Sequence, residues 1–189
     1  LVSPQVNYTD RDSHFIFGDV ATATILEAAE TVNTDTAFDI LSTKAKTVYS
    51  NNIRSNFGYM SRANDVDPFG PDKLFHQAGR RVFKEVCPMA AEHIASHLGQ
   101  HELTPDNVNR WWLHQANINM NTLICKKLLG RDANSEEAPI VLDEYANTAS
   151  AGSIIAFALY HQDLASQDVG VICSFGAGYS IGSLVVRKR

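Results

Sequence analysis

Apolar and polar residues alternate with two different periods along the chain, and these periods predict strands first and helices further on. β-branched and aromatic residues gather in three short segments, which predicts three strands, at His14–Phe17, Ala21–Leu26 and Phe38–Val48. The first two would be joined around Gly18-Asp19. Residues 50–71 are dense in Asn, Gly, Pro, Asp and Ser, which is the composition of a loop.

Beyond this loop, apolar side chains recur at helical spacing. Residues Leu74 to Leu98 predict a long helix that Asp72 can cap and Gly99 ends, with Pro88 as a candidate kink. Thr104 and Pro105 are the start signal of a short helix. The rest of the pattern predicts, in order, a strand at Trp111–His114, a helix at Asn117–Leu129, a short apolar run at Ile140–Leu142, a loop at Glu144–Thr148, a helix at Ala149–Gln162 and strands at Val169–Phe175 and Ser180–Val186.

This alternation of strands and helices predicts an α/β layered fold, because the apolar strand at 169–175 must be covered on both faces. An internal echo refines the prediction: Phe17-Gly18 and Phe175-Gly176 each stand between two strand-like segments. If the echo is a duplication, residues 1–49 are closing strands of an N-terminal half, 50–71 a linker, and 72–189 a C-terminal half. What precedes the first hairpin would then lie outside this sequence.

Composition excludes several classes of partner. The 189 residues are 44% hydrophobic and 20% charged, which is typical of a globular chain with a core. Sixteen Lys and Arg against 21 Asp and Glu give a net charge of −5, which argues against nucleic acid as a partner. The longest apolar stretch, Ile154–Tyr160, is far shorter than the roughly 20 residues that span a membrane, so no membrane partner is expected.

The three cysteines do not form a disulfide framework. Cys87, Cys125 and Cys173 are odd in number and lie in apolar contexts, which is typical of buried, reduced thiols. We therefore expect a cytoplasmic protein.

Three motifs carry polar groups or glycines at strand ends and loops, where α/β folds place their sites. His114-Gln115-Ala116-Asn117 follows a strand, and Asn147 lies in a loop before a helix of small residues. The third motif, Phe175–Ser180, contains glycines that let the main chain approach a ligand. A lone histidine at a strand end is usually structural, and Asn147 alone could be a turn residue; their combination favours a functional site.

In this order and spacing, the motifs resemble the C-terminal half of the thiolase-like condensing enzymes, most closely the β-ketoacyl-acyl-carrier-protein synthase III family. Phe17–Asp19 resembles the strand that closes the family's N-terminal half, and Gly79–Lys84 resembles its Gly-x-x-Val-Phe-Lys helix. The chain departs from the family in three places: Ala146 replaces a usual Gly, Asn119 replaces a common Arg, and residues 148–153 read Thr-Ala-Ser-Ala-Gly-Ser where the family has Thr-Ser-Ala-Ala-Ser. The resemblance implies an α-β-α-β-α layered fold in the intact enzyme, with this chain supplying the C-terminal half.

The resemblance also implies an acyltransferase that joins an acyl thioester to malonyl-acyl carrier protein by decarboxylative Claisen condensation. His114 and Asn147 would be the catalytic pair, donating hydrogen bonds to the enolate oxygen. The thioesters of coenzyme A or phosphopantetheine would be substrates, with no cofactor and no metal. Substrate-binding residues implied by the resemblance are Gly79, Phe83, Ala116, Asn117, Phe175, Gly176 and Gly178.

The nucleophilic cysteine of this reaction has no counterpart among Cys87, Cys125 and Cys173, because a reactive thiolate needs a helix N-terminus and partial exposure. We expect it on a missing N-terminal segment or a separate chain. The implied partners are that N-terminal half, acyl carrier protein and acyl-CoA, in a dimer of intact enzymes.

Several alternatives stay open. The chain could be a catalytically inert partner half, or a related synthase of the polyketide, quinolone or hydroxymethylglutaryl type. Arg80, Arg81 and Lys84 could form an ordinary charged face or a docking patch for the carrier protein or coenzyme A phosphates. The repeat of His93, His97 and His101 could bind zinc, but we predict a solvated helix face, because no Cys or carboxylate completes the set.

Overall fold

A four-stranded sheet with helices on both faces forms the body of the protein. The computed structural model describes residues 3–34, 36–54, 70 and 73–189. The sheet has the order β1-β6-β5-β4, with β6 antiparallel to both neighbours and β4 parallel to β5. Its strands are β1 (Phe38–Ser50), β4 (Arg110–Leu113), β5 (Val169–Gly176) and β6 (Gly178–Lys188).

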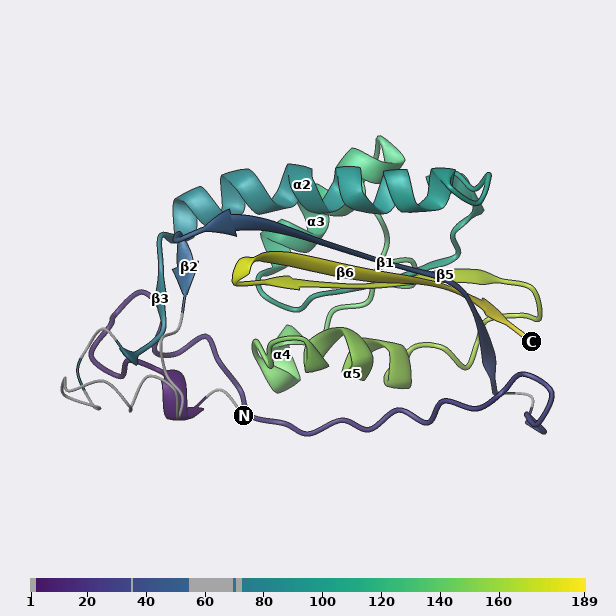
Figure 1. The fold of residues 1–189 in the computed structure, drawn as a ribbon, viewed down its shortest axis with the longest axis horizontal. Coiled ribbons are helices and arrows are strands. Elements are labelled where there is room, and N and C mark those ends of the chain that lie inside the picture. Colours follow the sequence, from purple (N-terminus) through teal and green to yellow (C-terminus); the bar gives the residue numbers. More distant parts are fainter. Residues whose placement is uncertain (1–2, 35, 55–69, 71–72) are drawn as a thin grey trace.

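The helices complete three layers. Figure 1 shows α2 and α3 over one face of the sheet and α4 and α5 over the other. Their bounds are Gly79–Gly99 for α2, Ile118–Leu129 for α3, Leu142–Tyr145 for α4 and Ala151–Leu159 for α5. The predicted α/β class is therefore confirmed, as are the three long strands of the sheet and the strand before His114.

Helix α2 ends where the sequence predicts and begins later. It runs through Pro88 and ends at Gly99. Its first residue is Gly79, not a position near Leu74, because His76–Gln77 (β3) pairs with Ile53–Arg54 (β2) in a separate two-stranded sheet. Asp72, the predicted cap, lies outside the described residues, as do 55–69 and 71 of the predicted loop.

The residues at the two ends of helix α3 explain where the helix begins and ends. Asn117 accepts a hydrogen bond from the Asn119 backbone N–H at 2.8 Å, which satisfies a donor of the first turn. Gly130 ends the helix in the left-handed conformation, with a φ of 70°. The short helix predicted after Thr104 is also present, at Pro105–Asn107 (η3), with a capping box.

Buried side chains form two cores, one on each face of the sheet. Trp111 packs with α2 and α3, whereas Trp112 packs with α5, since neighbouring residues of a strand point to opposite faces. Helix α5 is shorter than the predicted 149–162, and α4 occupies part of the predicted apolar run and loop. The helix of small residues allows close packing, because a Cβ at Gly152 would lie 2.8 Å from Gln115 Cβ.

The N-terminal segment, residues 3–34, contradicts the prediction of two strands. His14–Phe17 consists mainly of turns, and Ala21–Leu26 has no regular structure. Ile25 and Leu26 are 85% and 75% exposed. Neither of the strands predicted to flank Phe17-Gly18 forms. The structural surroundings of Phe17-Gly18 therefore differ from those of Phe175-Gly176, which ends β5. In the described part of the N-terminal segment, the regular structure consists of a 3₁₀ turn at Ser3–Gln5 (η1) and one β-bridge from Phe17 to Asn147.

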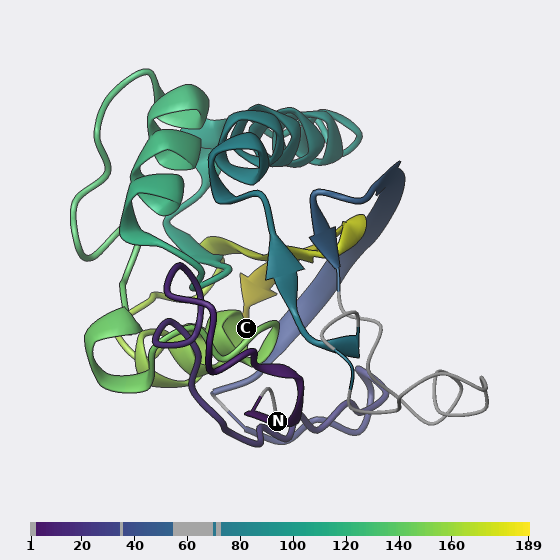
Figure 2. The ribbon, with the colours of Figure 1, turned by 90° about the vertical axis from the view of Figure 1, so that its left-hand side faces the viewer.

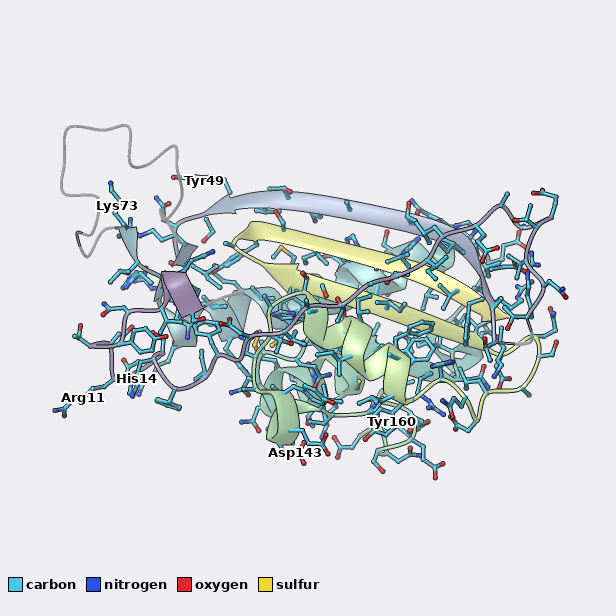
Figure 3. All side chains as sticks on the ribbon, turned by 90° about the horizontal axis from the view of Figure 1, so that it is seen from below. Arg11, His14, Tyr49, Lys73, Asp143 and Tyr160 are labelled. Carbon is cyan, nitrogen blue, oxygen red and sulfur yellow. The ribbon has the colours of Figure 1, made fainter. Side chains whose placement is uncertain are left out.

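Figures 1 and 2 place the N-terminal segment on the α4 and α5 side of the molecule, with β2 and β3 between it and α2. Figure 3 shows the exposed side chain of Arg11 directed away from the body of the molecule. In Figure 1 the segment runs below α4 and α5 along the length of the sheet, and it contributes no strand to the sheet.

The histidines of α2 are not a solvated face, which corrects the prediction. His93 and His97 are 3% and 1% exposed. The Ser183 hydroxyl lies 3.0 Å from His93 Nε2 and 2.7 Å from His97 Nδ1, and Ser42 Oγ lies 2.9 Å from His97 Nε2. Polar serines on β6 and β1 thus satisfy both ring nitrogens of His97 and Nε2 of His93, whereas His93 Nδ1 has no partner among the described residues. His101, the third histidine of the repeat, lies beyond the end of α2 and is exposed.

Candidate active site

Two parallel strands end side by side and bring His114 and Phe175 together. Leu113 at the end of β4 pairs with Cys173 of β5, so the residues that follow meet at one edge of the sheet. The rings of His114 and Phe175 lie edge to face, with centroids 4.7 Å apart and planes at 65°. The first and third sequence motifs therefore converge.

A cavity of about 1050 Å³ opens at this edge. Its walls come from the N-terminal segment, the start of α2, the ends of β4 and β5, the Asn147 loop and the start of β6. The predicted site residues that line it are Gly79, Phe83, His114, Ala116, Asn117, Asn147, Phe175 and Gly176. The sequence motifs thus meet around one space, although they are spread over about a hundred residues.

The backbone fixes Asn147 from both sides. Its N–H donates to Ile16 O at 2.9 Å, and its carbonyl accepts from Gly18 N at 3.0 Å. Its side-chain Oδ1 accepts from the Ala149 N–H at 3.0 Å. Because a backbone N–H can only donate, this contact assigns Oδ1 and leaves Nδ2 as the atom with which Asn147 can donate to a bound molecule.

Burial keeps His114 neutral. The side chain is 6% exposed, and burial lowers its pKa to about 4, against a smaller opposing effect of the backbone at Ala149. Its Nδ1 is buried without a hydrogen-bond partner among the described residues. At neutral pH the ring is therefore an uncharged imidazole that offers one N–H donor.

Three further residues belong to this site and were not assigned a role from the sequence. Gln115 is fully buried, and its Oε1 accepts from Val141 N at 3.0 Å, which braces the end of β4. Thr148 and Tyr179 line the cavity. The sequence offers one signal for Thr148 and Tyr179. Thr148 directly follows Asn147 and Tyr179 directly follows the glycine turn, and residues next to a motif in a tight loop share its surroundings.

The predicted residues outside the cavity lining are Gly178, Arg80, Arg81 and Lys84. Gly178 has a φ of 138°, a conformation that favours glycine, in the turn between β5 and β6. Arg80, Arg81 and Lys84 are exposed on the first turns of α2. In the described part of the chain, no group of His, Cys, Asp and Glu side chains is arranged to hold a metal ion.

The cysteines do not contribute a reactive thiol, as predicted. All three are buried and unpaired. Burial raises the pKa of Cys87 to about 11 and those of Cys125 and Cys173 to about 12. None of them lines the cavity. At neutral pH they are protonated and poor nucleophiles.

Comparison with known proteins agrees with the geometry. Residues 1–47 match the family described as 3-Oxoacyl-[acyl-carrier-protein (ACP)] synthase III, and residues 98–188 match its C-terminal domain. The chain is 55% identical to a beta-ketodecanoyl-[acyl-carrier-protein] synthase of Pseudomonas aeruginosa, over 100% of this chain and 55% of the relative. The chain belongs to the 3-oxoacyl-[acyl-carrier-protein] synthase III family.

Other members of the synthase III family match more distantly. The enzyme of Lactobacillus helveticus is 34% identical over 66% of this chain and 37% of its own length. This chain spans about half the length of the first curated relatives it matches.

Solved structures show the same fold. The synthase III of Aquifex aeolicus superposes with a TM-score of 0.74 at 21% identity, over 98% of this chain and 55% of that one. The priming beta-ketosynthase of the R1128 polyketide pathway gives a TM-score of 0.76 at 17% identity, over 98% and 54%. These likenesses confirm the predicted thiolase-like fold. In the described part of the chain, no helix has the length and apolar character needed to cross a membrane.

Proposed function

We propose that this chain is the part of a synthase III-type acyltransferase that decarboxylates a malonyl thioester and stabilises the resulting enolate. The observation that carries the proposal is the pairing of a neutral His114 with the Asn147 amide on one cavity. When the bond to the carboxylate breaks and CO₂ leaves, negative charge develops on the thioester oxygen. Two neutral donors that are themselves buried in the cavity wall stabilise that charge.

The enolate carbon would then attack the acyl group held as a thioester on the enzyme. A carbon–carbon bond forms, the carbon–sulfur bond breaks, and the cysteine takes up a proton as the 3-oxoacyl product leaves. Phe175 and Gly176 would lie beside the acyl group, and Gly79, Phe83, Ala116 and Asn117 along the pantetheine arm. Their shared position on the cavity supports these roles.

The nucleophilic cysteine would come from outside these 189 residues, on the same polypeptide or another one. The raised pKa values of Cys87, Cys125 and Cys173 support this, because none offers a thiolate at neutral pH. The relatives, which are about twice as long, also leave room for it. The same inert thiols favour a second candidate, a catalytically inert partner half of a heteromeric synthase.

For the acyl group we propose an octanoyl thioester, giving a 3-oxodecanoyl product. The support is the name of the 55% identical relative, a beta-ketodecanoyl synthase, since a malonyl unit adds two carbons. Arg80, Arg81 and Lys84 are exposed together and suit the phosphates of coenzyme A or an acidic carrier protein. A cytoplasmic location and a dimer of intact enzymes complete the proposal.

The test uses the full-length protein with octanoyl-CoA and malonyl-acyl carrier protein, following CO₂ release and acylation of the enzyme separately. We expect His114→Ala and Asn147→Ala to lower CO₂ release about 100- to 1000-fold, the effect of removing one oxyanion donor. Acylation, measured by intact mass, should persist. His101→Ala, at an exposed histidine just beyond the C-terminal end of α2, is the matched control.

Unchanged CO₂ release in both site variants would disprove the assigned roles. A wild-type protein that neither becomes acylated nor releases CO₂ would instead support the inert partner half.

A further inference from the structure

A hydrogen-bonded trio joins segments that are distant in the sequence: Asn52, Glu85 and Tyr179, called here the Glu85 trio. The Tyr179 hydroxyl donates to Glu85 Oε2 at 2.9 Å. Asn52 Nδ2 donates to the same oxygen, also at 2.9 Å. Asn52 precedes β2, Glu85 lies on α2 and Tyr179 lies at the start of β6. One carboxylate oxygen therefore ties three elements together.

Tyr179 is the member of the trio that faces the cavity. It is 3% exposed and lines the cavity together with Val82 and Val86, its neighbours from α2. It also directly follows the glycine turn that begins at Gly176. Among the described residues that form the cavity wall, neither Glu85 nor Asn52 is present. Glu85 therefore acts on the cavity indirectly, through Tyr179, which lines it, and through Asn52, which precedes the lining residue Ile53.

The hydrogen bond from Tyr179 to Glu85 is charge-assisted, because its acceptor is a carboxylate, and such bonds are stronger than those between neutral groups. Asn52 holds that carboxylate in turn, and the Asn52 carbonyl accepts from the Ala78 N–H at 2.7 Å, next to the start of α2. A side chain fixed in advance need not be immobilised when a ligand binds, and this immobilisation otherwise lowers affinity.

We propose that Glu85 is a positioning residue that fixes Tyr179 as a rigid wall of the cavity and so raises affinity for the acyl thioester. The inference rests on the proposed function, since it concerns how the same cavity holds its substrate.

The test compares four forms of the full-length protein: wild type, Glu85→Ala, Tyr179→Phe and Glu85→Gln. Binding is measured by calorimetry with S-octyl-coenzyme A, a thioether that cannot acylate the enzyme. We expect Glu85→Ala and Tyr179→Phe each to weaken binding about three- to tenfold and to raise KM for octanoyl-CoA by a similar factor. The value of kcat should stay within about twofold. Glu85→Gln keeps an oxygen acceptor and loses the charge, so its affinity should lie between those of wild type and Glu85→Ala.

The double variant Glu85→Ala/Tyr179→Phe should bind no worse than the weaker single variant, because both changes remove the same bond. Glu92→Ala, an exposed glutamate further along α2, is the matched control and should leave binding unchanged. If Glu85→Ala does not fold, Tyr179→Phe and Glu85→Gln still decide the question.

Wild-type affinity in both Glu85→Ala and Tyr179→Phe would overturn this inference alone. Additive losses in the double variant would overturn it too. A wild-type protein that neither binds the thioether nor releases CO₂ would overturn the proposed function and this inference with it.

Discussion

Ala21–Leu26 and Phe38–Val48 have similar sequence patterns and different structures. Both are rich in β-branched and apolar residues, yet only the second forms a strand. Strand β1 pairs with β6 along most of its length, whereas no strand in the described part of the chain pairs with 21–26. Strand propensity reports how well side chains suit a pleated surface. A strand also needs a neighbour to satisfy its backbone N–H and C=O groups.

The largest expected effect that tests this contrast is a difference in stability between two Leu→Ala variants, one in each region. Leu113→Ala removes a side chain that is 1% exposed in β4 and should lower the free energy of unfolding by about 2–5 kcal/mol. Leu26→Ala, at a position 75% exposed, should change it by less than about 0.5 kcal/mol. Urea denaturation of the two variants measures both values. A large loss for Leu26→Ala would show that the N-terminal segment is packed in the protein.

A smaller loss of stability should appear on acidification, and it should arise from the buried histidines His93, His97 and His114. Burial lowers the pKa of His97 and His114 from the ordinary 6.5 to about 4, and it also lowers the pKa of His93. For His97, the neighbouring His93, Lys44 and His101 act in the same direction. The unfolded chain therefore binds more protons than the folded one between pH 6.5 and 4.

Stability from these histidines is complete above pH 6.5 and is lost as pH falls toward 4. We expect urea midpoints to fall across this window, with a slope of up to about one proton per histidine. His97→Gln should flatten the dependence, and His14→Gln, exposed on the N-terminal segment, is the matched control. A flat profile for the wild type would contradict the burial of these rings.

The smallest effect tests the junction of the two regions, where Phe17 meets Asn147. Ala146 has a φ of 55° and a ψ of −159°, a conformation that is nearly restricted to glycine. Ala146→Gly should therefore raise the free energy of unfolding by about 1 kcal/mol. Ala95→Gly, exposed within α2, should lower it by about the same amount, because glycine weakens a helix. Destabilisation by both changes would show that Ala146 is not strained.

Local signals predicted the packed region well. Asn117 and Gly130 bound a helix through their own backbone preferences, and the apolar β5 could only be a buried strand. The same logic fails where tertiary contacts decide the structure. His93 and His97 look like surface residues in the sequence, because nothing near them in the chain reveals Ser183 and Ser42 as partners.

The candidate site divides in the same way. The order and spacing of the motifs, through their resemblance to the synthase III family, predicted that His114, Asn147 and Phe175 belong to one site, and all three line the cavity. The contribution of Ile16 and Gly18, which hold the Asn147 backbone, was not foreseen. Neither was the bond from Tyr179 to Glu85, 94 residues away, because no local pattern marks such a pair.

The central place of β6 has a consequence for how the chain is made. Phe38 pairs with Lys188, so β1 cannot acquire this neighbour until β6 has been translated. At about 5–20 residues per second, β1 remains without this partner for about 7 to 30 seconds during synthesis. During that interval an open strand edge faces the crowded cell, and such edges pair readily with other chains. Nascent chains should therefore depend on chaperones until β6 emerges and the sheet closes.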